Sequence, residues 1–550
     1  MAIARRLDGL LNQTRGIDLR RIGYALASVW YAGLFYGNTL RVKHPGRLLA
    51  KLDEAWPGDA ARGAALLRGE FDLAGHMVRV ADFPWSAAAP DAWRIALHRF
   101  DWLSDLQAVG DRTARERAQA LVANWIATQS KWRPLPWRPD ILAARIANWL
   151  SQTEFLVGNS YEAEYAILES VARQGKHLRR SAPLARQGSE RFAIARGLAM
   201  LSICLPGERL KLNRALDYLK REISAQVLGD GGLIERSPTQ LFAVLKEMVA
   251  LRTALRDSDA GEPEELQNAI DRIAPMVRFF RHGDGSLALF NGTREESPLM
   301  IDVALARAEA RGKPLSEAVH SGFQRVAASR TLVIMDAGVP APPGWDREAH
   351  AGTLSFEMSV GKERLVVNCG ALPAAGAEWR AAQRATAAHS TVTVEDLNSA
   401  ELRRDGLGAR PRHVEVARRE ADGNVWIEAA QDGYQAPLGI AHRRRIYVAA
   451  DGSDVRGEDS LAGSANRKFA VRFHLHPSVQ ASPVQGGSAV LLKMPGGTGW
   501  RFRAQGGPIS IQESIYLGAG EPKRTDQIVL TGVTERDGAL VKWAFTRVSG

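Results

Sequence analysis

The sequence is poor in cysteine and lacks the short motifs of several common enzyme classes. Its 550 residues include two cysteines, Cys204 and Cys369, which lie far apart and have no partners at metal-ligand spacing. This excludes a disulfide framework and a zinc finger as the organising element. There is also no GxxxxGKS/T, no strand-coupled GxGxxG, no GxSxG, no HExxH and no CxxC. Nucleotide hydrolysis, dinucleotide redox chemistry and serine-hydrolase chemistry are therefore not indicated.

The charge of the chain is positive but not concentrated. Lys and Arg total 72 against 61 Asp and Glu, for a formal net charge of +11 and an isoelectric point near 9.8. This balance favours an anionic partner: nucleic acid, an anionic membrane surface or an acidic polymer. The longest pure basic run is Arg443 to Arg445, so a basic tail is missing and we expect no sequence-specific nucleic-acid partner. Apolar residues make up 45% of the chain, which is enough for a sizeable globular core.

An uncharged, aromatic-rich run lies near the N-terminus. Residues 22–40 carry no charge and are flanked by Arg21 and Arg41. A bilayer-spanning helix needs about 20 mostly apolar residues, whereas this run contains Asn38 and several tyrosines. A secretory leader would be shorter and would lack acidic residues such as Asp18. The run is typical of a buried or interfacial helix, with an anchor or an uncleaved export signal as the alternative, and contact with a membrane surface through 22–40 is compatible with both.

Helical periodicity dominates from about residue 52 to residue 280. Apolar residues recur at i, i+3, i+4, i+7 and i+8, which predicts amphipathic helices. Clear examples are Leu121, Val122, Trp125 and Ile126; Leu142, Ile146, Trp149 and Leu150; and Leu241, Val244, Leu245, Met248 and Val249. Short links make successive helices antiparallel neighbours. Such hairpins in series form a closed toroid, an open solenoid or a bundle, and periodicity does not choose among them.

The period changes from 3.6 to 2 after Phe280, with the switch near 281–330. Alternation of apolar and polar residues predicts short strands, for example around Val392 and Val394; Val471, Phe473 and Leu475; and Val541, Trp543 and Phe545. Turns such as Asp422-Gly423 and Asp451-Gly452 separate the strands. The C-terminal half is therefore predicted to be a sandwich-like assembly of antiparallel strands.

Several histidines stand at the edges of predicted strands. His350 and His389 each precede a strand, so the two side chains could converge on one edge of a sheet. His474 and His476 alternate with apolar residues, and period two places both on one face of their strand. A divalent metal in the β domain is left open, with His474 as its candidate ligand, because the pair lacks a visible third ligand. For each of these histidines a polar structural role is the alternative.

Other polar candidates lie in loops: Glu235, Arg236, Asn291 and Tyr434. The first two belong to a turn-rich loop that ends at Ser237-Pro238, an N-cap followed by proline at the first helical position. Their alternative role is to frame the start of that helix. Asn291 and Tyr434 have the formation of turns as their alternative role. Isolated residues of this kind do not identify a reaction by themselves.

Six short motifs occur along the chain in an informative order. They are LHRFDWL (97–103), GDGGLIERSPTQ (229–240), RHGDGSLALFNG (281–292), HAGTLSFE (350–357), AHSTVTVED (388–396) and FHLHP (473–477). Together they resemble the heparinase II/III family of polysaccharide lyases over roughly 85–550, in its bacterial branch described only as heparinase II/III-like. The uncharged run predicts an N-terminal segment with an apolar helix (1–50), and the resemblance implies an α/α toroid (51–320) followed by an antiparallel β-sandwich domain (321–550), an α+β multidomain chain. It also implies a location in the cell envelope or periplasm; no clear cleavable signal peptide is present, and a cytoplasmic location stays open.

Membership of this family implies β-elimination on a uronic-acid polymer. A base removes the C5 proton beside the carboxylate, a neutralising group holds that carboxylate, and an acid protonates the departing glycosidic oxygen. The characterised lyases take an Asn and a Tyr from the helical domain and a His from the β domain. Here Glu190 and Arg191 stand where Asn and His are expected, and Gln240 stands where the Tyr is expected. His350 stands where the family has its β-domain histidine.

Resemblance and residue type together predict a site near a cleft between toroid and sandwich. Its candidate catalytic residues are His350, His389, Tyr434 and Arg191, of which Arg191 would neutralise the carboxylate and His350 or Tyr434 would move the proton. Its candidate substrate-binding residues are Glu190, Glu235, Arg236, Gln240 and Asn291. No cofactor is firmly implied. The first hypothesis is a lyase that cleaves an acidic polysaccharide; the alternative is a non-catalytic cell-envelope polysaccharide-binding or assembly protein with a degenerate lyase site. The identity of the polysaccharide and the oligomeric state are not predicted.

Overall fold

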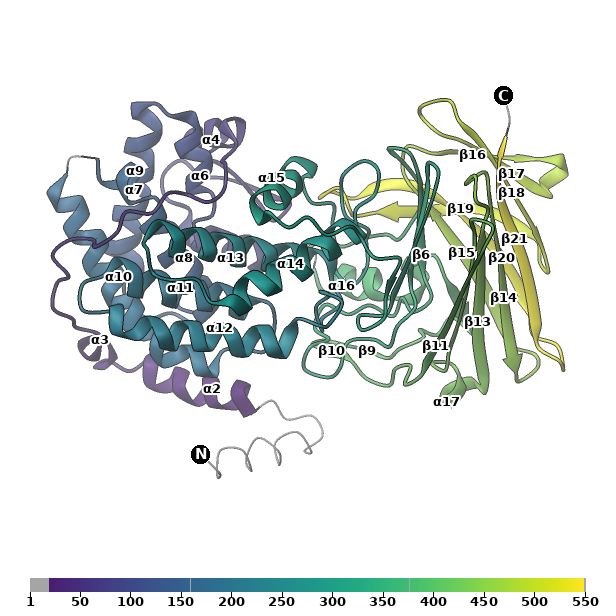
Figure 1. Cartoon of the computed structure of the whole chain (residues 1–550), viewed down its shortest axis with the longest axis horizontal. Helices are drawn as coiled ribbons and strands as arrows, with labels where there is room; N and C mark the ends of the chain where they lie inside the picture. Colours follow the sequence, from purple (N-terminus) through teal and green to yellow (C-terminus); the bar gives the residue numbers. More distant parts are fainter. Residues whose placement is uncertain (1–18, 159, 375, 549–550) are drawn as a thin grey trace. The chain divides into compact units, whose positions relative to one another are not determined.

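The computed structural model describes residues 19–158, 160–374 and 376–548. The described chain divides into two compact units, the first within Met1–Gln226 and Lys246–Asn268, the second within Val227–Leu245 and Ala269–Gly550. Helices make up most of the first unit and antiparallel strands most of the second (Figure 1). The predicted order, helices first and antiparallel sheets afterwards, is confirmed.

The helices of the N-terminal half differ widely in length. In chain order they are α2 (Leu19–Tyr31), α3 (Tyr36–Thr39), α4 (Ala60–Leu67), α5 (Asp91–Arg99), α6 (Leu103–Val109), α7 (Arg112–Gln129), α8 (Pro139–Ser151), α9 (Thr153–Val157), α10 (Tyr161–Ser181), α11 (Glu190–Cys204), α12 (Leu212–Gln226), α13 (Pro238–Asp257), α14 (Glu264–Phe279) and α15 (Pro298–Ala308). A small hairpin, β1 (Glu70–Leu73) and β2 (His76–Arg79), follows α4. The three stretches with the clearest helical period fall in α7, α8 and α13.

The centre of the first unit is made by α8, which is buried from Pro139 to Leu150 and packs against α5, α10 and α11. Arg145 of this helix is fully buried. Its guanidinium donates to the side chain of Gln174 and to the carbonyls of His98 and Pro136, and it lies 4.0 Å from the ring centroid of Trp125. Because a buried cation is tolerated only when its donors are satisfied, this network is structural.

Helix α2 has two different faces. On the inner face, Tyr31 packs against Trp132 and His177. On the outer face, the large apolar side chains are between 45% and 95% exposed in α2 and the turn that follows: Ile22, Leu26, Val29, Trp30, Leu34 and Phe35. Within the described ranges, no helix combines the length and the apolar content that a bilayer crossing requires.

The second unit contains two large antiparallel sheets. One has eight strands in the order β11-β12-β13-β14-β21-β18-β17-β16, and the other has nine, in the order β19-β20-β15-β7-β6-β5-β4-β3 with β8 beside β15. The strands are β3 (Glu317–Ala318), β4 (Phe323–Ala328), β5 (Thr331–Asp336), β6 (Phe356–Val360), β7 (Glu363–Val367), β8 (Val392–Val394), β11 (Val414–Ala421), β12 (Asn424–Gln431), β13 (Ile440–Val448), β14 (Asp454–Gly463), β15 (Lys468–Leu475), β16 (Gln480–Val484), β17 (Ala489–Lys493), β18 (Gly499–Gln505), β19 (Ile509–Tyr516), β20 (Lys523–Val533) and β21 (Ala539–Val548). A further pair, β9 (Leu402–Arg403) and β10 (Gly406–Leu407), and two short helices, α16 (Ala377–Arg384) and α17 (Gln435–Leu438), lie in the connections.

Both sheets contribute to one apolar core, which is the defining feature of a sandwich. Strand β13 shows how its sequence, IAHRRRIYV, produces two faces. Ile440, His442, Arg444, Ile446 and Val448 alternate into the core, and the intervening residues face outward. The buried Arg444 is paired through two nitrogens with Asp459 of β14, which also accepts from His442 and from the Trp543 indole.

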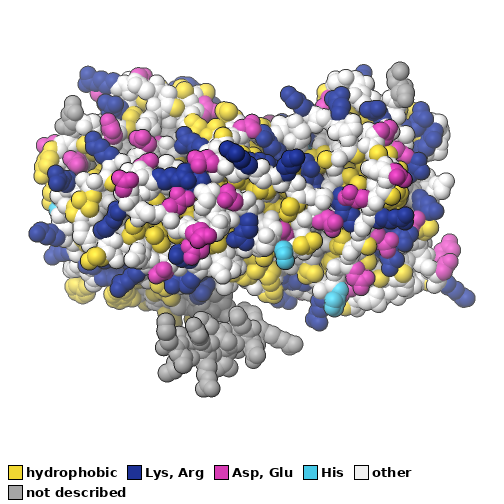
Figure 2. Space-filling model, in the orientation of Figure 1, with side chains coloured by type: hydrophobic (Ala, Val, Ile, Leu, Met, Phe, Trp, Pro, Cys, Tyr) yellow, Lys and Arg dark blue, Asp and Glu magenta, His cyan; other side chains and the backbone are white. Residues whose placement is uncertain are grey.

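Charges on the outer surface are mixed. Figure 2 shows Lys and Arg side chains distributed over the visible face with Asp and Glu among them. The net positive charge of the chain is therefore spread over this face in the way that the sequence, with its short basic runs, predicts.

Candidate functional site

The structure brings His350 and His389 into contact in the second unit. His350 lies in the loop before β6, and His389 follows a short 3-10 turn (Thr386–Ala388) before β8. Nδ1 of His350 is 3.0 Å from Nε2 of His389, although 39 residues separate them in the chain. Both side chains are buried. The expected convergence of the two histidines therefore occurs, in the interior of the unit.

The partners of the pair determine its tautomers. The backbone N–H of Gly292 donates to Nε2 of His350, so the proton of a neutral His350 is on Nδ1 and points to His389. Nδ1 of His389 faces the carbonyl oxygen of Ala385 at 2.8 Å and must donate to it, which leaves Nε2 to accept from His350. The chain of hydrogen bonds is complete with both rings neutral. All four ring nitrogens are occupied by protein groups.

Burial keeps both rings neutral. It lowers the pKa of His389 to about 4, and it lowers the pKa of His350 well below the usual range, with the neighbouring His389 and Arg384 acting in the same direction. In this structure both rings act as satisfied hydrogen-bonding groups, and their catalytic role stays a prediction.

Asn291 and Arg236 hold the loops around this pair. The Asn291 side chain accepts from the backbone N–H of His350 and donates to the carbonyl of Arg236. The guanidinium of Arg236 donates to the carbonyls of Ser321 and Gly322 and pairs with Asp336 at 2.6 Å. Both side chains are buried and bonded to the protein, and the substrate-binding role of Asn291 and Arg236 stays a prediction.

Glu235 and Gln240 lie on either side of the start of α13. Glu235 is 9% exposed and Gln240 is half-buried. Next to them the backbone N–H and hydroxyl of Thr239 bond to Thr293 and Glu296, which fastens the loop to the 281–297 segment. The predicted start of this helix at Ser237-Pro238 agrees with the observed one at Pro238.

A second buried polar cluster was not predicted from the sequence. Nδ1 of His282 bonds to Ser359, and its Nε2 lies 3.0 Å from Glu357, which is fully buried. Arg364 pairs with Asp284 at 2.7 Å. The RHGDG sequence at 281–285 carries two of these residues, and its polar character before a run of apolar residues is the signal that could have indicated them. The cluster fastens the 281–297 loop to β6 and β7.

The other predicted residues lie elsewhere. Arg191 and Glu190 belong to α11 of the first unit, where Arg191 is buried against Tyr218 and pairs with Glu222 at 3.1 Å. Tyr434 is in the core of the sandwich, and its hydroxyl donates to the carbonyl of Val392. Burial raises the pKa of Tyr434.

His474 does not have the surroundings of a metal ligand. Its Nδ1 bonds to Ser514 and its Nε2 to the carbonyl of Ala387. Across the part of the chain that the structure describes, no group of three or more His, Cys, Asp or Glu side chains is arranged to hold a metal ion. We therefore assign no metal to His474.

Comparison with known proteins agrees with this architecture. Residues 310–544 match the model of the heparinase II/III-like C-terminal domain. FtsZ-localized protein C of Caulobacter vibrioides (strain NA1000 / CB15N) is 35% identical over 547 residues, which cover 95% of this chain and 94% of that protein. A crystal structure of heparinase III has the same fold, with a TM-score of 0.73 at 14% identity over 98% of this chain and 92% of that one. The heparan sulfate lyase HepC from Pedobacter heparinus has a TM-score of 0.58 at 16% identity over the same shares.

The fold is that of an α/α toroid followed by an antiparallel β-sandwich, as expected. The family match lies in the second unit, which contains both sheets and the histidine pair. The full-length relative extends the similarity to the helical unit. The chain therefore belongs to the heparinase II/III-like family.

Proposed function

We propose that this chain is a non-catalytic protein of cell-envelope assembly that binds an acidic saccharide and retains a degenerate lyase site. The observation that carries the proposal is the closed hydrogen-bond chain from Gly292 through His350 and His389 to Ala385. It leaves no ring nitrogen for a substrate proton. A lyase needs at least one of these groups to exchange protons with the sugar.

The residues at the other positions where the lyases have catalytic groups also favour a non-catalytic protein. Gln240 has a carboxamide that does not titrate, so it cannot act as the base or acid that a tyrosine supplies. Glu190 is an anion at the place of the group that neutralises the uronate carboxylate, and two like charges repel. Arg191 already neutralises Glu222. Fold and activity are separable, and here the fold is kept while the reacting groups are replaced.

An elimination assay tests the proposal directly. Cleavage of a uronate polymer creates an unsaturated product that absorbs in the ultraviolet. We expect no rise in absorbance when the purified protein is incubated with heparan sulfate, chondroitin sulfate, alginate or pectate, and the same flat trace for His350→Ala. An active heparinase serves as the positive control. A rise with the wild-type protein that is lost in His350→Ala would replace this proposal by the lyase hypothesis.

We also propose that the outer face of α2 docks on an anionic membrane surface. The six exposed apolar side chains at 22, 26, 29, 30, 34 and 35 recur with helical spacing, and basic residues flank the run at Arg20, Arg21 and Arg41. An amphipathic helix of this kind lies in the plane of the interface with its apolar face in the lipid. The inner face of the helix is already packed against aromatic side chains of the first unit.

Vesicle sedimentation tests the membrane contact. The full chain is expected to sediment with vesicles of phosphatidylcholine and phosphatidylglycerol, and the double variant Leu26→Glu/Val29→Glu is expected to stay in the supernatant. Leu210→Glu is the matched control, because Leu210 lies in the same unit and is 93% exposed but is far from α2 in the chain. Equal sedimentation of all three proteins would refute the docking face.

The Caulobacter relative carries the name FtsZ-localized protein, which places that protein with FtsZ. We extend this location to the present chain on the basis of the full-length similarity. A fluorescent fusion that follows FtsZ in the source organism would support the extension. A diffuse signal in cells with normal FtsZ assemblies would contradict it.

A further inference from the structure

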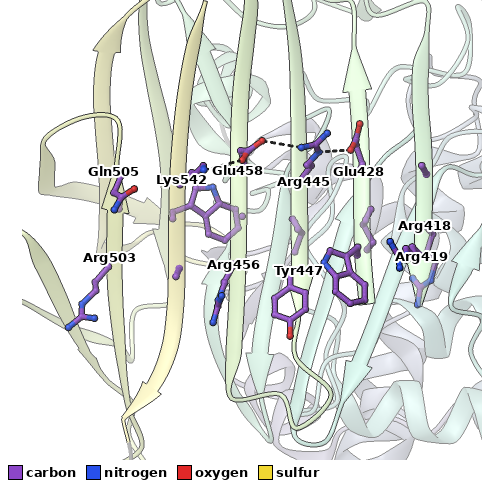
Figure 3. Close-up of a pocket in the computed structure, with 18 of the residues that line it drawn as sticks. Arg418, Arg419, Glu428, Arg445, Tyr447, Arg456, Glu458, Arg503, Gln505 and Lys542 are labelled. Carbon is purple, nitrogen blue, oxygen red and sulfur yellow. Dashed lines mark hydrogen bonds and ion pairs between the residues drawn. The ribbon is translucent and has the colours of Figure 1, made fainter. Parts of the chain in front are cut away.

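The outward face of the eight-stranded sheet carries an open groove of about 930 Å³ in the second unit. It crosses β11, β12, β13, β14, β21 and β18, and residues of the turn between β16 and β17 line it as well. Figure 3 shows its labelled basic and acidic side chains. None of the predicted site residues lines this groove.

Strand register arranges the floor of the groove in two parallel rows. The first row, which we call the aromatic row, runs across six strands through Arg419, Trp426, Tyr447, Arg456, Ala544 and Arg503. The second, the charge row, lies two residues along and runs through Glu428, Arg445, Glu458, Lys542 and Gln505. With neighbouring strands about 4.8 Å apart, the aromatic row is about 24 Å long.

The aromatic row has two neighbouring rings, tilted 47° to one another, with cations on both sides. The rings of Trp426 and Tyr447 lie 5.1 Å apart. The guanidinium of Arg419 lies 5.7 Å from the Trp426 ring, and that of Arg456 lies 5.8 Å from the Tyr447 ring. The Arg456 side chain is 67% exposed, and its ion pair is with Asp454 at the strand end. Among the described residues, neither Arg419 nor Arg503 has an ion-pair partner, so both are available to an anion.

The charge row is internally neutralised. Arg445 pairs with Glu428 on one side and with Glu458 on the other, and Lys542 lies 4.0 Å from Glu458 (Figure 3). These carboxylates are partly exposed, so they remain able to accept hydrogen bonds from hydroxyl groups.

We infer that this groove is a binding site for an acidic oligosaccharide. Exposed aromatic rings offer the apolar contact that the faces of sugar rings make, and the flanking arginines suit carboxylate or sulfate groups. The carboxylates of the charge row suit sugar hydroxyls. A ligand that carries both acidic groups and many hydroxyls therefore matches both rows at once.

The same two rows disfavour the other polyanions. A single strand of DNA carries a charge on every nucleotide but, unlike a saccharide, has no sugar hydroxyl along its length to donate to Glu428 and Glu458. A peptide strand usually adds to a free sheet edge through its backbone. The groove lies over the face of the sheet, and all of its strands except the edge strand β11 are paired on both sides. The inference rests on the proposed function for its class of ligand, and it adds the place and the residues.

Binding of defined oligomers tests the groove in the full chain. Oligogalacturonate and oligoalginate are the probes, and neutral malto-oligosaccharides, oligo-dT and oligoglutamate are the comparison ligands, all measured by titration calorimetry at one salt concentration. We expect the acidic saccharides to bind. The double variant Arg419→Gln/Arg503→Gln is expected to weaken binding about tenfold or more, and Trp426→Ala by a similar factor.

Arg501→Gln is the matched control for the charge change. Arg501 lies on β18 two residues from Arg503, on the same face by strand alternation, and does not line the groove. It is expected to keep wild-type affinity, and Trp426→Phe is expected to restore most of what Trp426→Ala loses. Melting temperatures show that each variant is folded.

The outcomes separate the groove from the proposed function. If acidic oligosaccharides bind and the groove variants bind them equally well, the groove is the wrong site while saccharide binding stands. If oligo-dT or oligoglutamate binds as tightly as the acidic saccharides, the groove is a general polyanion surface and the inference fails. If no acidic saccharide, short or polymeric, binds at all, both the groove and the proposed function are refuted.

Discussion

Arg444 and Arg445 are neighbours on β13 and lie on opposite faces of one sheet. Arg444 is fully buried, donates to the carbonyls of Leu354 and Ser390, and is paired with Asp459 through two nitrogens. Arg445 is half exposed and shares its charge between Glu428 and Glu458 in the groove. The same type of side chain therefore supports the core on one face and lines the outward groove on the other.

The histidine pair and the groove differ in the same way. At His350 and His389 each polar atom has a protein partner, and burial removes the charge from both rings. Along the aromatic row the rings are partly exposed, and Arg419 and Arg503 keep their charges for solvent or ligand. Buried polar groups are tolerated because each has a hydrogen-bond partner within the protein. A group that is bonded in this way is not available to a ligand. The contacts of the histidine pair are therefore structural, whereas the sheet surface carries two arginines without an ion-pair partner among the described residues.

The largest predicted effect is a loss of stability when Arg444, on the buried face of the sheet, is replaced. Arg444→Gln leaves Asp459 in the core with His442 and Trp543 as its remaining partners. Burial by itself raises the pKa of Asp459, whereas Arg444 and His442 together hold it below its usual range. Loss of one partner of a buried pair costs roughly 3–5 kcal/mol. Urea denaturation followed by tryptophan fluorescence should show this decrease in the free energy of unfolding.

Arg445→Gln is the control on the opposite face. An exposed ion pair is worth up to about 1 kcal/mol, so this variant is expected to unfold close to the wild type. Equal destabilisation by the two substitutions would show that the two faces do not differ as described.

Acid should weaken the fold through the buried histidines. The pKa of His389 is lowered to about 4 in the folded chain, against about 6.5 in the unfolded one, so the unfolded chain binds the additional proton between these values. Stability contributed by the neutral ring is complete above about pH 6.5 and is lost as the pH falls towards 4. For His389 the loss between pH 7.5 and pH 5 amounts to about 2 kcal/mol.

Replacing His389 measures its contribution to the pH dependence of stability. His389→Gln is expected to reduce the difference in unfolding free energy between pH 7.5 and pH 5 by about 2 kcal/mol. His320→Gln, at an exposed position, is expected to leave the difference as it is. A pH dependence that is the same in all three proteins would show that His389 does not titrate as proposed.

Much of the fold could be predicted because it depends on short-range periodicity. The 3.6 period at Leu241 to Val249 lies within α13, and the alternation at Val471, Phe473 and Leu475 lies within β15. These patterns reflect one buried face, which each element has regardless of its neighbours. The three arginines 443–445 show where this kind of prediction fails. A run of like charges suggests a solvated surface, but strand alternation directs the side chain of Arg444 into the core. There it pairs with Asp459 of the next strand.

The candidate site was predictable only in part for the same physical reason. That His350 and His389 could converge follows from their positions before two strands. That all their ring nitrogens are hydrogen-bonded depends on the backbone atoms of Gly292 and Ala385, which no pattern around the histidines specifies. The His282–Glu357 contact joins residues 75 positions apart. Turn geometry sets the register within a hairpin, but the aromatic row also needs β14 to pair with β21 and β21 with β18, which are not neighbours in the chain.

The smallest predicted change in stability concerns the exposed side of the comparison. Trp426 is 39% exposed and contacts Tyr447 across the strands, so Trp426→Ala removes a surface pair worth about 0.2–1 kcal/mol. Trp543, on the opposite face of the same sheet, stacks on Phe356 in the core, and its replacement by Ala is expected to cost roughly 3–5 kcal/mol. Urea denaturation of the two variants compares the faces directly. If Trp426→Ala destabilises as strongly as Trp543→Ala, Trp426 is a structural residue, and a loss of ligand binding in that variant would report on folding instead of recognition. A small effect means that Trp426 contributes little to the fold, so that a loss of saccharide binding in Trp426→Ala would report on recognition.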